Sequence, residues 1–312
     1  MKKIVILDAK TLGEVPNLEQ LQKYGNVVSY QTSIASETLS RVKDAEIVIT
    51  NKVVLDRNTL SKCKNLELVC ISATGMNNVD LDAAKENGIL VKNAVGYSSH
   101  SVAQHTFASI LKLYHQISYY DDYVKSGKYS KSEIFTHYGP PITELYKKHF
   151  GIIGLGNIGK TVAKIADGFG AKVAYYSTSG KNTNNNLQQL SLTDLLKWAD
   201  IVSIHAPLNE LTKNLISKKE LDIMKPNSIL INVGRGGIID ESALAHAINV
   251  QQIGGACIDV YENEPINSDN PLLSVNSPEK ILLTPHNAWA SIEARTKLVD
   301  IVCENIREYL NK

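Results

Sequence analysis

The sequence lacks long apolar runs, clustered cysteines and a strong net charge. No apolar stretch approaches the roughly 18 residues that a membrane-spanning helix needs. The formal net charge of +1 gives no reason to expect nucleic acid or an anionic membrane as a partner. No His, Cys or Asp cluster has the spacing of metal ligands, so we expect no metal. The four scattered cysteines, expected to be free buried thiols, are Cys63, Cys70, Cys257 and Cys303.

The amino terminus carries no recognisable targeting signal. The run M-K-K-I-V-I-L-D is too short for the core of a signal peptide, and no cleavage site follows it. It favours a buried first strand that ends at Asp8, and the cytoplasm is the expected compartment. With 312 residues, 43% of them hydrophobic and 21% charged, the chain has the composition of a globular protein and the length for two domains.

Short runs rich in Val and Ile alternate with stretches of helical period. The expected strands lie at 3–8, 46–50, 67–71 and 88–91, and then at 151–154, 172–176, 201–205, 228–233, 255–259 and 281–284. Strands that alternate with helices form parallel sheets, and continuous apolar runs indicate that both faces are covered. Because these strands are too many for one comfortable sheet, we expect an α/β fold with two doubly wound parallel-sheet domains.

Two longer helices are expected. Ser101 and Gln104 match a capping box, and apolar residues follow at helical spacing until Gly127, a plausible stop. After His286 the chain forms a terminal helix, and the sequence leaves open which group of strands it covers. Its apolar face comprises Ile292, Leu298, Val299, Val302, Ile306 and Leu310. The polar run at 182–186 predicts an exposed loop.

The run F-G-I-I-G-L-G-N-I-G-K places Gly154, Gly156 and Gly159 in G-x-G-x-x-G spacing, after an expected strand and before an expected helix. The first glycine permits a tight turn, the second lets the backbone approach a pyrophosphate, and the third lets the helix pack close to the strand. Alone the pattern is weak, but the strand before it and the helix after it favour a dinucleotide site.

A carboxylate is missing where such a site usually binds the adenosine ribose. Ser177 ends the next expected strand, 18 residues beyond Gly159, and Thr178, Ser179 and Lys181 follow it. An acid there would accept hydrogen bonds from the ribose 2′-hydroxyl and repel a 2′-phosphate. A solvated turn is the plain alternative, especially for Lys181. We expect a neutral to slightly positive pocket that binds NAD and tolerates NADP.

Three polar residues follow late strands, where open parallel sheets bind ligands. Arg235 lies in N-V-G-R-G-G, Glu264 in D-V-Y-E-N-E-P and His286 in L-L-T-P-H-N-A-W. Each alone is more often a surface or capping residue. Together with a nicotinamide they suffice for reversible hydride transfer to a 2-oxo acid. Arg235 would anchor the acid, His286 would supply the proton and Glu264 would orient His286.

The remaining histidines show no ligand spacing. His100 and His105 lie at the start of the long helix, where they either line a ligand-binding cleft or serve as capping or packing residues. His205 ends an expected strand and either faces the cofactor or packs in the core. The full set is His100, His105, His115, His137, His149, His205 and His246.

Over nearly its whole length the sequence resembles the NAD(P)-dependent D-2-hydroxyacid dehydrogenase family. The motifs G-L-G-N-I-G, H-A-P-L-N-E-L-T, N-V-G-R-G-G-I-I-D, D-V-Y-E-N-E-P and T-P-H-N-A-W-A-S occur in the family's order and spacing. The resemblance implies the catalytic trio Arg235, Glu264 and His286. It implies two Rossmann-like or flavodoxin-like domains with a cleft between them: a substrate domain at 1–99 plus 288–312, and a nucleotide domain at 100–287. It also implies a homodimer formed through the long helix of the nucleotide domain.

The resemblance further implies two sets of binding residues. The substrate carboxylate would be held by Thr74, Gly75 and Met76, with Asn51 and Lys52 nearby. The cofactor would contact Gly154, Gly156, Asn157, Ile158, Gly159, Ser177, Thr178, Ser179, His205, Ala206, Pro207, Thr212, Val233, Gly234, Asp259 and Ala288.

The motifs W-A-S, T-N-K and Y-S-T-S-G-K look most like the glycerate dehydrogenase, or hydroxypyruvate reductase, branch. The chain departs from the family pattern at Ser177, usually Asp, and at Gln104, where Glu is common. The expected reaction interconverts hydroxypyruvate or glyoxylate and D-glycerate or glycolate. A larger branched or aromatic 2-oxo acid stays open, as does an NAD-sensing corepressor that binds peptides.

Overall fold

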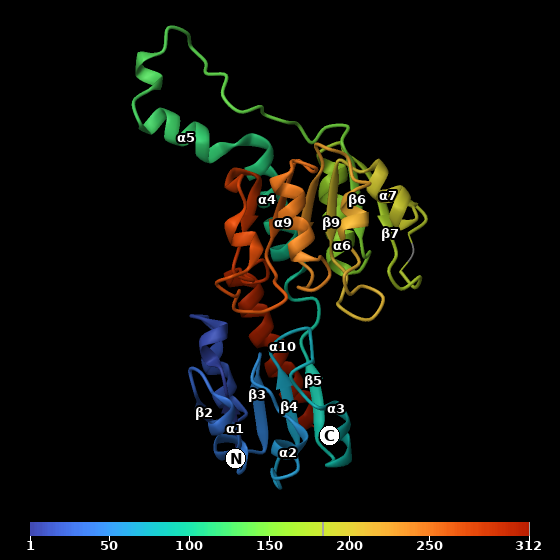
Figure 1. Cartoon of the computed structure of the whole chain (residues 1–312). Helices are drawn as coiled ribbons and strands as arrows, with labels where there is room; N and C mark the ends of the chain where they lie inside the picture. The colour runs from blue at the N-terminus through green and yellow to red at the C-terminus, as the bar shows by residue number, and fades with distance from the viewer. Residues whose placement is uncertain (183, 312) are drawn as a thin grey trace. The chain divides into compact units, whose positions relative to one another are not determined.

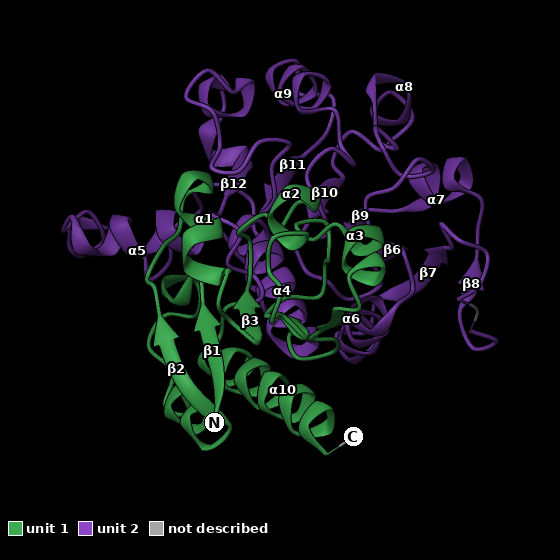
Figure 2. Ribbon diagram, turned by 90° about the horizontal axis from the view of Figure 1, so that it is seen from below, with its two compact units in different colours: residues 1–98, 290–312 green, residues 99–289 purple. Residues whose placement is uncertain are grey.

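The computed structural model describes residues 1–182 and 184–311, and the chain divides into two compact units. Unit 1 comprises Met1–Ser98 and Ala290–Lys312, and unit 2 comprises Ser99–Trp289 (Figure 2). The expected loop at 182–186 includes Thr183, and the expected segment 288–312 includes Lys312; these two residues lie outside the described ones.

Unit 1 is built on a parallel five-stranded sheet in the order β2-β1-β3-β4-β5 (Figure 1). Its strands are β1 (Lys2–Ile6), β2 (Gly25–Ser29), β3 (Ile47–Thr50), β4 (Leu68–Ile71) and β5 (Leu90–Asn93). Every residue of β3 and β4 is buried, as continuous apolar runs predict. The sequence did not reveal β2, because it pairs with β1 at the edge of the sheet and holds only two apolar residues.

The helices of unit 1 are short except for the last. They are η1 (Ala9–Leu12), η2 (Leu18–Lys23), α1 (Ala35–Val42), α2 (Arg57–Leu60), α3 (Leu81–Glu86) and α10 (Ile292–Leu310). Helix α10 packs against β4 and η2, and this contact settles which strands the terminal helix covers. Four of the expected apolar residues are buried, whereas Ile292 and Leu310 stay exposed at the two ends of the helix. Asn17 anchors α10 because its Nδ2 donates to Asp300 Oδ1 at 2.8 Å.

Unit 2 is built on a parallel seven-stranded sheet in the order β12-β11-β10-β9-β6-β7-β8. Its strands are β6 (His149–Ile153), β7 (Lys172–Tyr176), β8 (Gln188–Gln189), β9 (Ile201–Ile204), β10 (Ile229–Asn232), β11 (Gly255–Ile258) and β12 (Ile281–Leu283). The predicted α/β class with two parallel sheets is confirmed. The two-residue β8 was missed because it is polar and pairs only with β7.

Helices cover both faces of this sheet. They are α4 (Ser99–His115), α5 (Ile117–Lys125), α6 (Asn157–Gly168), α7 (Leu192–Trp198), α8 (Lys218–Leu221) and α9 (Glu241–Asn249), with η3 (Tyr129–Lys131), η4 (Pro271–Ser274) and η5 (Pro278–Lys280). Buried residues of α4 and α6 share one apolar cluster with the sheet, and those of α7 and α9 share another. This two-sided packing explains why the strands read as continuous apolar runs.

The long helix differs from its prediction at both ends. It begins at Ser99, so Ser101 does not cap it; the Ser101 hydroxyl instead donates to the Ala288 carbonyl at 2.7 Å. It ends at His115, because Gln116 adopts a left-handed conformation with φ 50°. The chain then continues as α5, which has no buried residue and extends away from the sheet of unit 2 (Figure 1).

Candidate active site

The polar residues singled out in the sequence of unit 2 follow the carboxyl ends of its parallel strands. These ends share one edge of the sheet, because every strand pair is parallel. The chain order reverses at β6, which lies between β7 and β9. Ligands of doubly wound folds bind at such a switch point. The glycine turn follows β6 at this position.

The backbone of the glycine turn fits a dinucleotide. A Cβ atom at Gly154 would lie 3.0 Å from Ala206 backbone atoms, and Gly154 has a φ of 92°. A Cβ atom at Gly159 would lie 2.3 Å from the Gly154 oxygen, so only glycine lets α6 pack this close to β6. Over Gly156 no atom lies within 4 Å of such a Cβ. This open space, at the amino terminus of a twelve-residue helix, would admit a pyrophosphate.

Two polar atoms near this turn are buried without a partner among the described residues. They are Ser177 Oγ, just after β7, and His205 Nδ1, just after β9. His205 Nε2 lies 2.8 Å from Ser203 Oγ, and burial lowers the pKa of His205 to about 3, so its ring is neutral at pH 7. Buried polar atoms are usually paired, and a nucleotide bound here would supply partners. The donor set therefore fits the expected cofactor.

The other expected cofactor residues line the same edge. Thr212 is buried and closes the loop after β9, since its hydroxyl donates to the Pro207 carbonyl at 2.6 Å. Val233 and Gly234 follow β10 directly, and Asp259 follows β11. Asn157 and Ile158 lie in the first turn of α6, and Thr178 and Ser179 continue the chain after Ser177.

His286 and Glu264 form a direct pair. His286 Nδ1 lies 2.7 Å from Glu264 Oε2, and the two side chains are 23% and 31% exposed. The other carboxylate oxygen, Oε1, accepts the Tyr261 amide hydrogen at 3.1 Å, which fixes Glu264 in its own loop. Because Nδ1 faces the carboxylate, the Nε2 atom of His286 is the ring nitrogen left to exchange a proton with a substrate.

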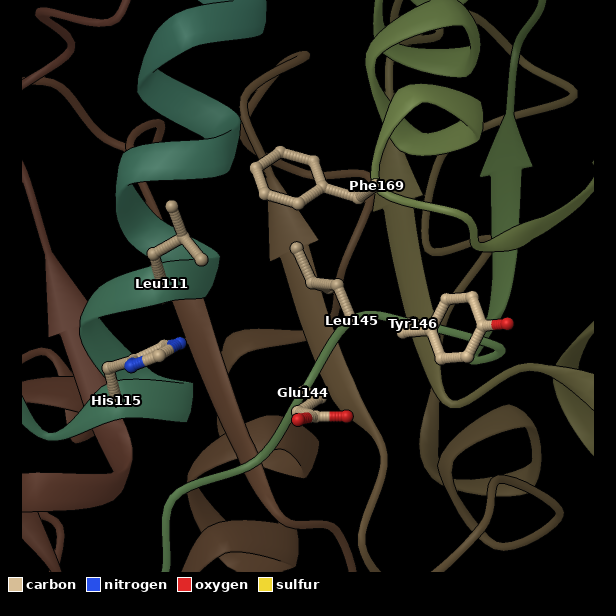
Figure 3. A pocket seen from close by; sticks show the side chains of 6 residues that line it. All are labelled: Leu111, His115, Glu144, Leu145, Tyr146 and Phe169. Carbon is tan, nitrogen blue, oxygen red and sulfur yellow. The ribbon is translucent and has the colours of Figure 1, made fainter.

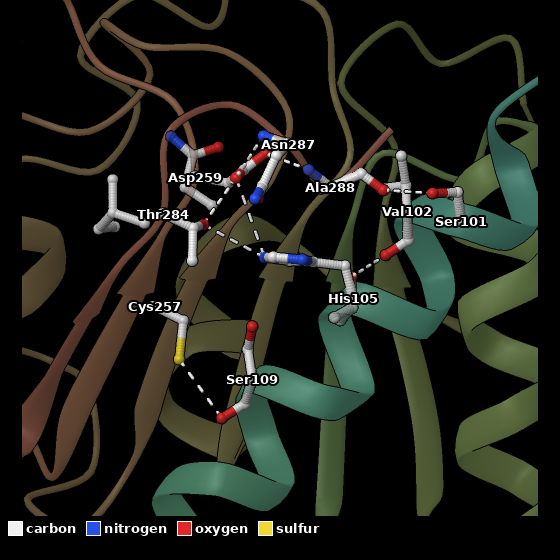
Figure 4. Close-up of polar contacts among 12 residues, drawn as sticks. Ser101, Val102, His105, Ser109, Cys257, Asp259, Thr284, Asn287 and Ala288 are labelled. Carbon is white, nitrogen blue, oxygen red and sulfur yellow. Dashed lines mark hydrogen bonds and ion pairs between the residues drawn. The ribbon is translucent and has the colours of Figure 1, made fainter. Parts of the chain in front are cut away.

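His286 lies in a strained loop that Asp259 holds. Its φ of 51° is left-handed, which costs about 1–3 kcal/mol for a residue other than glycine. Asp259 is buried and accepts hydrogen bonds from the amides of Asn287 (2.9 Å) and Ala288 (3.0 Å), and from the Thr284 hydroxyl (2.6 Å) (Figure 4). The strained residue is thus bracketed by hydrogen bonds to one buried carboxylate.

Arg235 lies in a loop that packs on the loop of Glu264. A Cβ atom at Gly236 would lie 1.8 Å from the Tyr261 oxygen, so the two backbones touch where only glycine fits. Nη1 of Arg235 donates to the Gly234 carbonyl at 2.8 Å. The backbone carbonyl of Arg235 accepts a hydrogen bond from Asn232 Nδ2 at 2.9 Å. The structure thus brings Glu264 and His286 into contact and links Arg235 to them through this backbone packing.

The expected substrate residues all lie in unit 1. Thr74, Gly75 and Met76 follow β4, and no oxygen in the described part of unit 1 accepts a hydrogen bond from their amides. Asn51 and Lys52 follow β3, and both of their amides donate to the carboxylate of Asp8, at 2.9 and 2.7 Å. Successive backbone amides that lack an acceptor are a common way to bind an anion.

The sequence argument missed the side chains that hold these loops. Asp8 shapes the loop after β3, and Asn78 joins it to the loop after β4 by donating to the Val53 carbonyl at 3.0 Å. In unit 2, His105 and Thr284 join the Asp259 network (Figure 4). Asp8 could have been found by the rule used for Arg235, a polar residue directly after a buried strand. His105 carried no such signal.

Neither a metal cluster nor a membrane span is found in the described part of the chain. No group of three or more His, Cys, Asp or Glu side chains there could hold a metal ion. None of the described helices combines the length and apolar composition of a membrane-crossing segment.

Comparison with known proteins identifies the family. The model of the "D-isomer specific 2-hydroxyacid dehydrogenase, NAD binding domain" matches residues 107–288. The chain is 37% identical to a hydroxypyruvate reductase of Blautia hydrogenotrophica, covering 99% of this chain and 97% of that protein. It is 35% identical to a glycerate dehydrogenase of Methylorubrum extorquens, with 99% and 96% covered.

Among solved structures, an acyclic imino acid reductase in complex with NADPH and D-Arg superposes with a TM-score of 0.88 at 32% identity, over 99% of this chain and 97% of that one. The two-sheet α/β fold agrees with the structural match. The chain belongs to the D-isomer specific 2-hydroxyacid dehydrogenase family and is an NAD(P)-dependent oxidoreductase of 2-hydroxy acids.

Proposed function

We propose that this protein reduces a small 2-oxo acid, hydroxypyruvate or glyoxylate, to D-glycerate or glycolate with NAD(P)H, in a reversible reaction. The observation that carries the proposal is the 2.7 Å contact between His286 Nδ1 and Glu264 Oε2 at the carboxyl edge of the sheet. Two relatives that match nearly the whole chain are named hydroxypyruvate reductase and glycerate dehydrogenase, which supports this substrate class.

His286 is the proposed proton donor. The carboxylate of Glu264 faces Nδ1 and favours a proton there, so Nε2 delivers the second proton to the carbonyl oxygen as the alcohol forms and recovers it in the reverse direction. Glu264 stabilises the charged imidazole, and the Tyr261 amide keeps the carboxylate in place. The nicotinamide, when bound, supplies the hydride that reduces the carbon.

Arg235 is the proposed anchor for the acid. One guanidinium nitrogen already donates to the Gly234 carbonyl, which orients the group and leaves further N–H donors for a carboxylate or a carbonyl oxygen. We propose that the amides of Thr74–Met76, with Asn51 and Lys52, bind the substrate carboxylate. The supporting observation for Thr74–Met76 is that their amides have no acceptor in the described part of unit 1. Asn51 and Lys52 are included because they follow the neighbouring strand β3, and their own amides already donate to Asp8.

The proposed domain roles follow from these assignments. Residues 1–99 plus 288–312 form the substrate domain, and residues 100–287 form the nucleotide domain. The glycine turn and the two unpaired atoms, Ser177 Oγ and His205 Nδ1, support the second role. With no acid after β7, we propose that NAD is bound with little discrimination against NADP. The cytoplasmic location stays a prediction, which cell fractionation would test.

A homodimer is the proposed assembly, formed by α4 and the arm, residues 116–143. The arm is held internally: the rings of Tyr123 and His137 stack 3.7 Å apart, and Tyr120 donates to the Pro140 carbonyl at 2.7 Å. Yet Phe135 is 90% and Tyr138 86% exposed. Burying each ring would remove about 150–250 Å² from water. With two copies of each, the four rings would supply about 600–1,000 Å², and α4 would have to supply the rest of the roughly 1,200 Å² that a specific symmetric interface buries.

A hollow at the base of the arm lies next to the proposed interface helix α4. A shallow hollow of about 390 Å³ lies there, lined by apolar and polar side chains (Figure 3). The lining residues are Leu111, His115, Glu144, Leu145, Tyr146 and Phe169. Leu111 and His115 belong to α4, so the hollow borders the helix through which the dimer is proposed to form.

A panel of 2-oxo acids with both reduced cofactors tests the proposal. Purified protein is mixed with NADH or NADPH and hydroxypyruvate, glyoxylate, or a branched or aromatic 2-oxo acid, and cofactor oxidation is followed by absorbance. We expect the highest kcat/KM with one of the two small acids. Preference for a larger acid would replace the substrate assignment. Absence of oxidation with every acid, together with nucleotide-dependent peptide binding, would favour the corepressor-like alternative.

A further inference from the structure

We propose that His105 is a positioning residue for His286, acting through Thr284 and Asp259. The inference rests on the proposed function, in which His286 carries the proton. It assigns a role to a histidine that lies on α4, far from His286 in the sequence.

The hydrogen bonds around Thr284 have a defined direction. His105 Nε2 lies 3.2 Å from Thr284 Oγ1 and 3.9 Å from Asp259 Oδ1. The Thr284 hydroxyl has one hydrogen, and it donates this hydrogen to Asp259 Oδ1 at 2.6 Å. The same oxygen must therefore accept from His105, so Nε2 carries a hydrogen. Figure 4 shows the His105 ring directed from α4 toward this pair.

Asp259 connects Thr284 and His105 to the loop of His286 through hydrogen bonds. Its two oxygens accept the amides of Asn287 and Ala288, which directly follow His286 in the chain. Thr284 lies on the other side of His286 and accepts the His286 amide hydrogen on its carbonyl at 3.0 Å. A left-handed residue such as His286 persists only where its surroundings over-determine the backbone. The His105–Thr284–Asp259 chain is such a surrounding.

Helix α4 holds the same loop at a second point. Ser101, one turn before His105, donates to the Ala288 carbonyl at 2.7 Å. Helix α4 thus contacts the segment 284–288 on both sides of His286. If the His105 bond is removed, Thr284 loses its direct hydrogen bond to α4, while the Ser101–Ala288 bond still ties the loop to the helix. The imidazole of His286 should then leave its alignment with Glu264 more often. The expected loss is therefore in turnover and not in ligand affinity.

The test compares three variants with the wild-type protein. His105→Leu should lower kcat about tenfold, equivalent to about 1.4 kcal/mol, while KM for the 2-oxo acid and the Kd of NAD(P)H stay within about twofold. His105→Gln places an amide N–H near the Nε2 position and should restore most of kcat. His246→Leu removes an exposed histidine of α9 outside the network and serves as the matched control, with kcat unchanged.

Hydrogen exchange supplies a readout that does not need activity. The amide hydrogens of the peptide covering 284–289 should exchange faster in His105→Leu than in the wild-type protein or the control. This peptide contains the amides of Asn287 and Ala288, which donate to Asp259. Equal exchange together with unchanged kcat would overturn the inference. If wild-type protein turns over no 2-oxo acid, the proposed function fails, and the exchange experiment still decides whether His105 orders this loop.

A double-mutant cycle separates positioning from general destabilisation. Thr284→Val removes the hydroxyl that links His105 to Asp259 and should lower kcat by itself. If His105 acts through Thr284, the double variant should lose no more kcat than the worse single variant. Losses that multiply would show independent effects and contradict the proposed chain. Thr284→Val also keeps the test available if His105→Leu fails to fold.

Discussion

The pair of His286 and Glu264 gives the sharpest test of the proposed chemistry. Replacing Glu264 by Gln keeps the size of the side chain and leaves an oxygen that can accept the Tyr261 amide hydrogen, so the loop should stay in place. The change removes the negative charge from the atom 2.7 Å from His286 Nδ1. The amide nitrogen also donates where the carboxylate accepted, which favours the wrong tautomer of the imidazole.

The size of the effect follows from the contact. A hydrogen bond to a charged group contributes about 1.5–3 kcal/mol, and the two side chains are less than one third exposed, so solvent screens the pair only in part. If this stabilisation applies when the imidazole is protonated, its loss lowers the rate about 10- to 100-fold, at about 1.4 kcal/mol for each factor of ten. The wrong tautomer adds to this loss.

The assay is steady-state oxidation of NAD(P)H with the best 2-oxo acid from the panel. We expect kcat/KM of Glu264→Gln to fall about 10- to 100-fold, with NAD(P)H affinity unchanged. Glu262→Gln, in the same loop and exposed, removes the same charge away from His286 and should behave as wild type. A value of kcat/KM for Glu264→Gln within about twofold of the wild type would refute the role assigned to the pair.

Four further predictions concern other parts of the molecule. His286→Ala should lower kcat about 10²–10⁴-fold while NAD(P)H still quenches protein fluorescence on binding; unchanged turnover would remove His286 as the proton donor. Ser177→Asp should raise the preference for NAD over NADP at least about tenfold by repelling the 2′-phosphate, and an unchanged ratio of the two Kd values would place the ribose elsewhere. Replacing both Phe135 and Tyr138 by Glu should yield monomers by analytical ultracentrifugation, whereas a wild-type mass would exclude the arm from the interface. The folded protein keeps His205 neutral with a pKa of about 3, while the unfolded chain binds a proton near pH 6.5, so the free energy of unfolding should fall by about 1.4 kcal/mol per pH unit between about pH 6.5 and pH 3. Urea unfolding of His205→Gln over this range should show a smaller slope with pH, and equal slopes would refute the assignment.

The sequence predicted those site residues whose side chains suit the proposed reaction and which follow the carboxyl end of an expected strand. Arg235 and Glu264 follow the buried strands β10 and β11, and His286 follows the half-buried β12. Parallel strands bring such positions to one edge of the sheet. Their mutual distances were not predictable, because a loop after a strand can turn in many directions. The 2.7 Å contact of His286 depends on a left-handed backbone and on Asp259, neither of which leaves a pattern in the sequence. For the same reason the sequence could not decide whether His105 lines the cleft, caps the helix or packs.

The sequence by itself determined the α/β class, ten of the strands and the glycine turn, because burial on both faces and close backbone approach restrict the residue types at each position. The tertiary structure decided what depends on neighbours from elsewhere in the chain. The edge strands β2 and β8 form because they pair with β1 and β7. Helix α10 packs on unit 1 because it contacts β4 and accepts a hydrogen bond from Asn17. Hydrogen bonds between distant segments carry no local periodicity, so only the folded chain could disclose the link from α4 to the loop of His286.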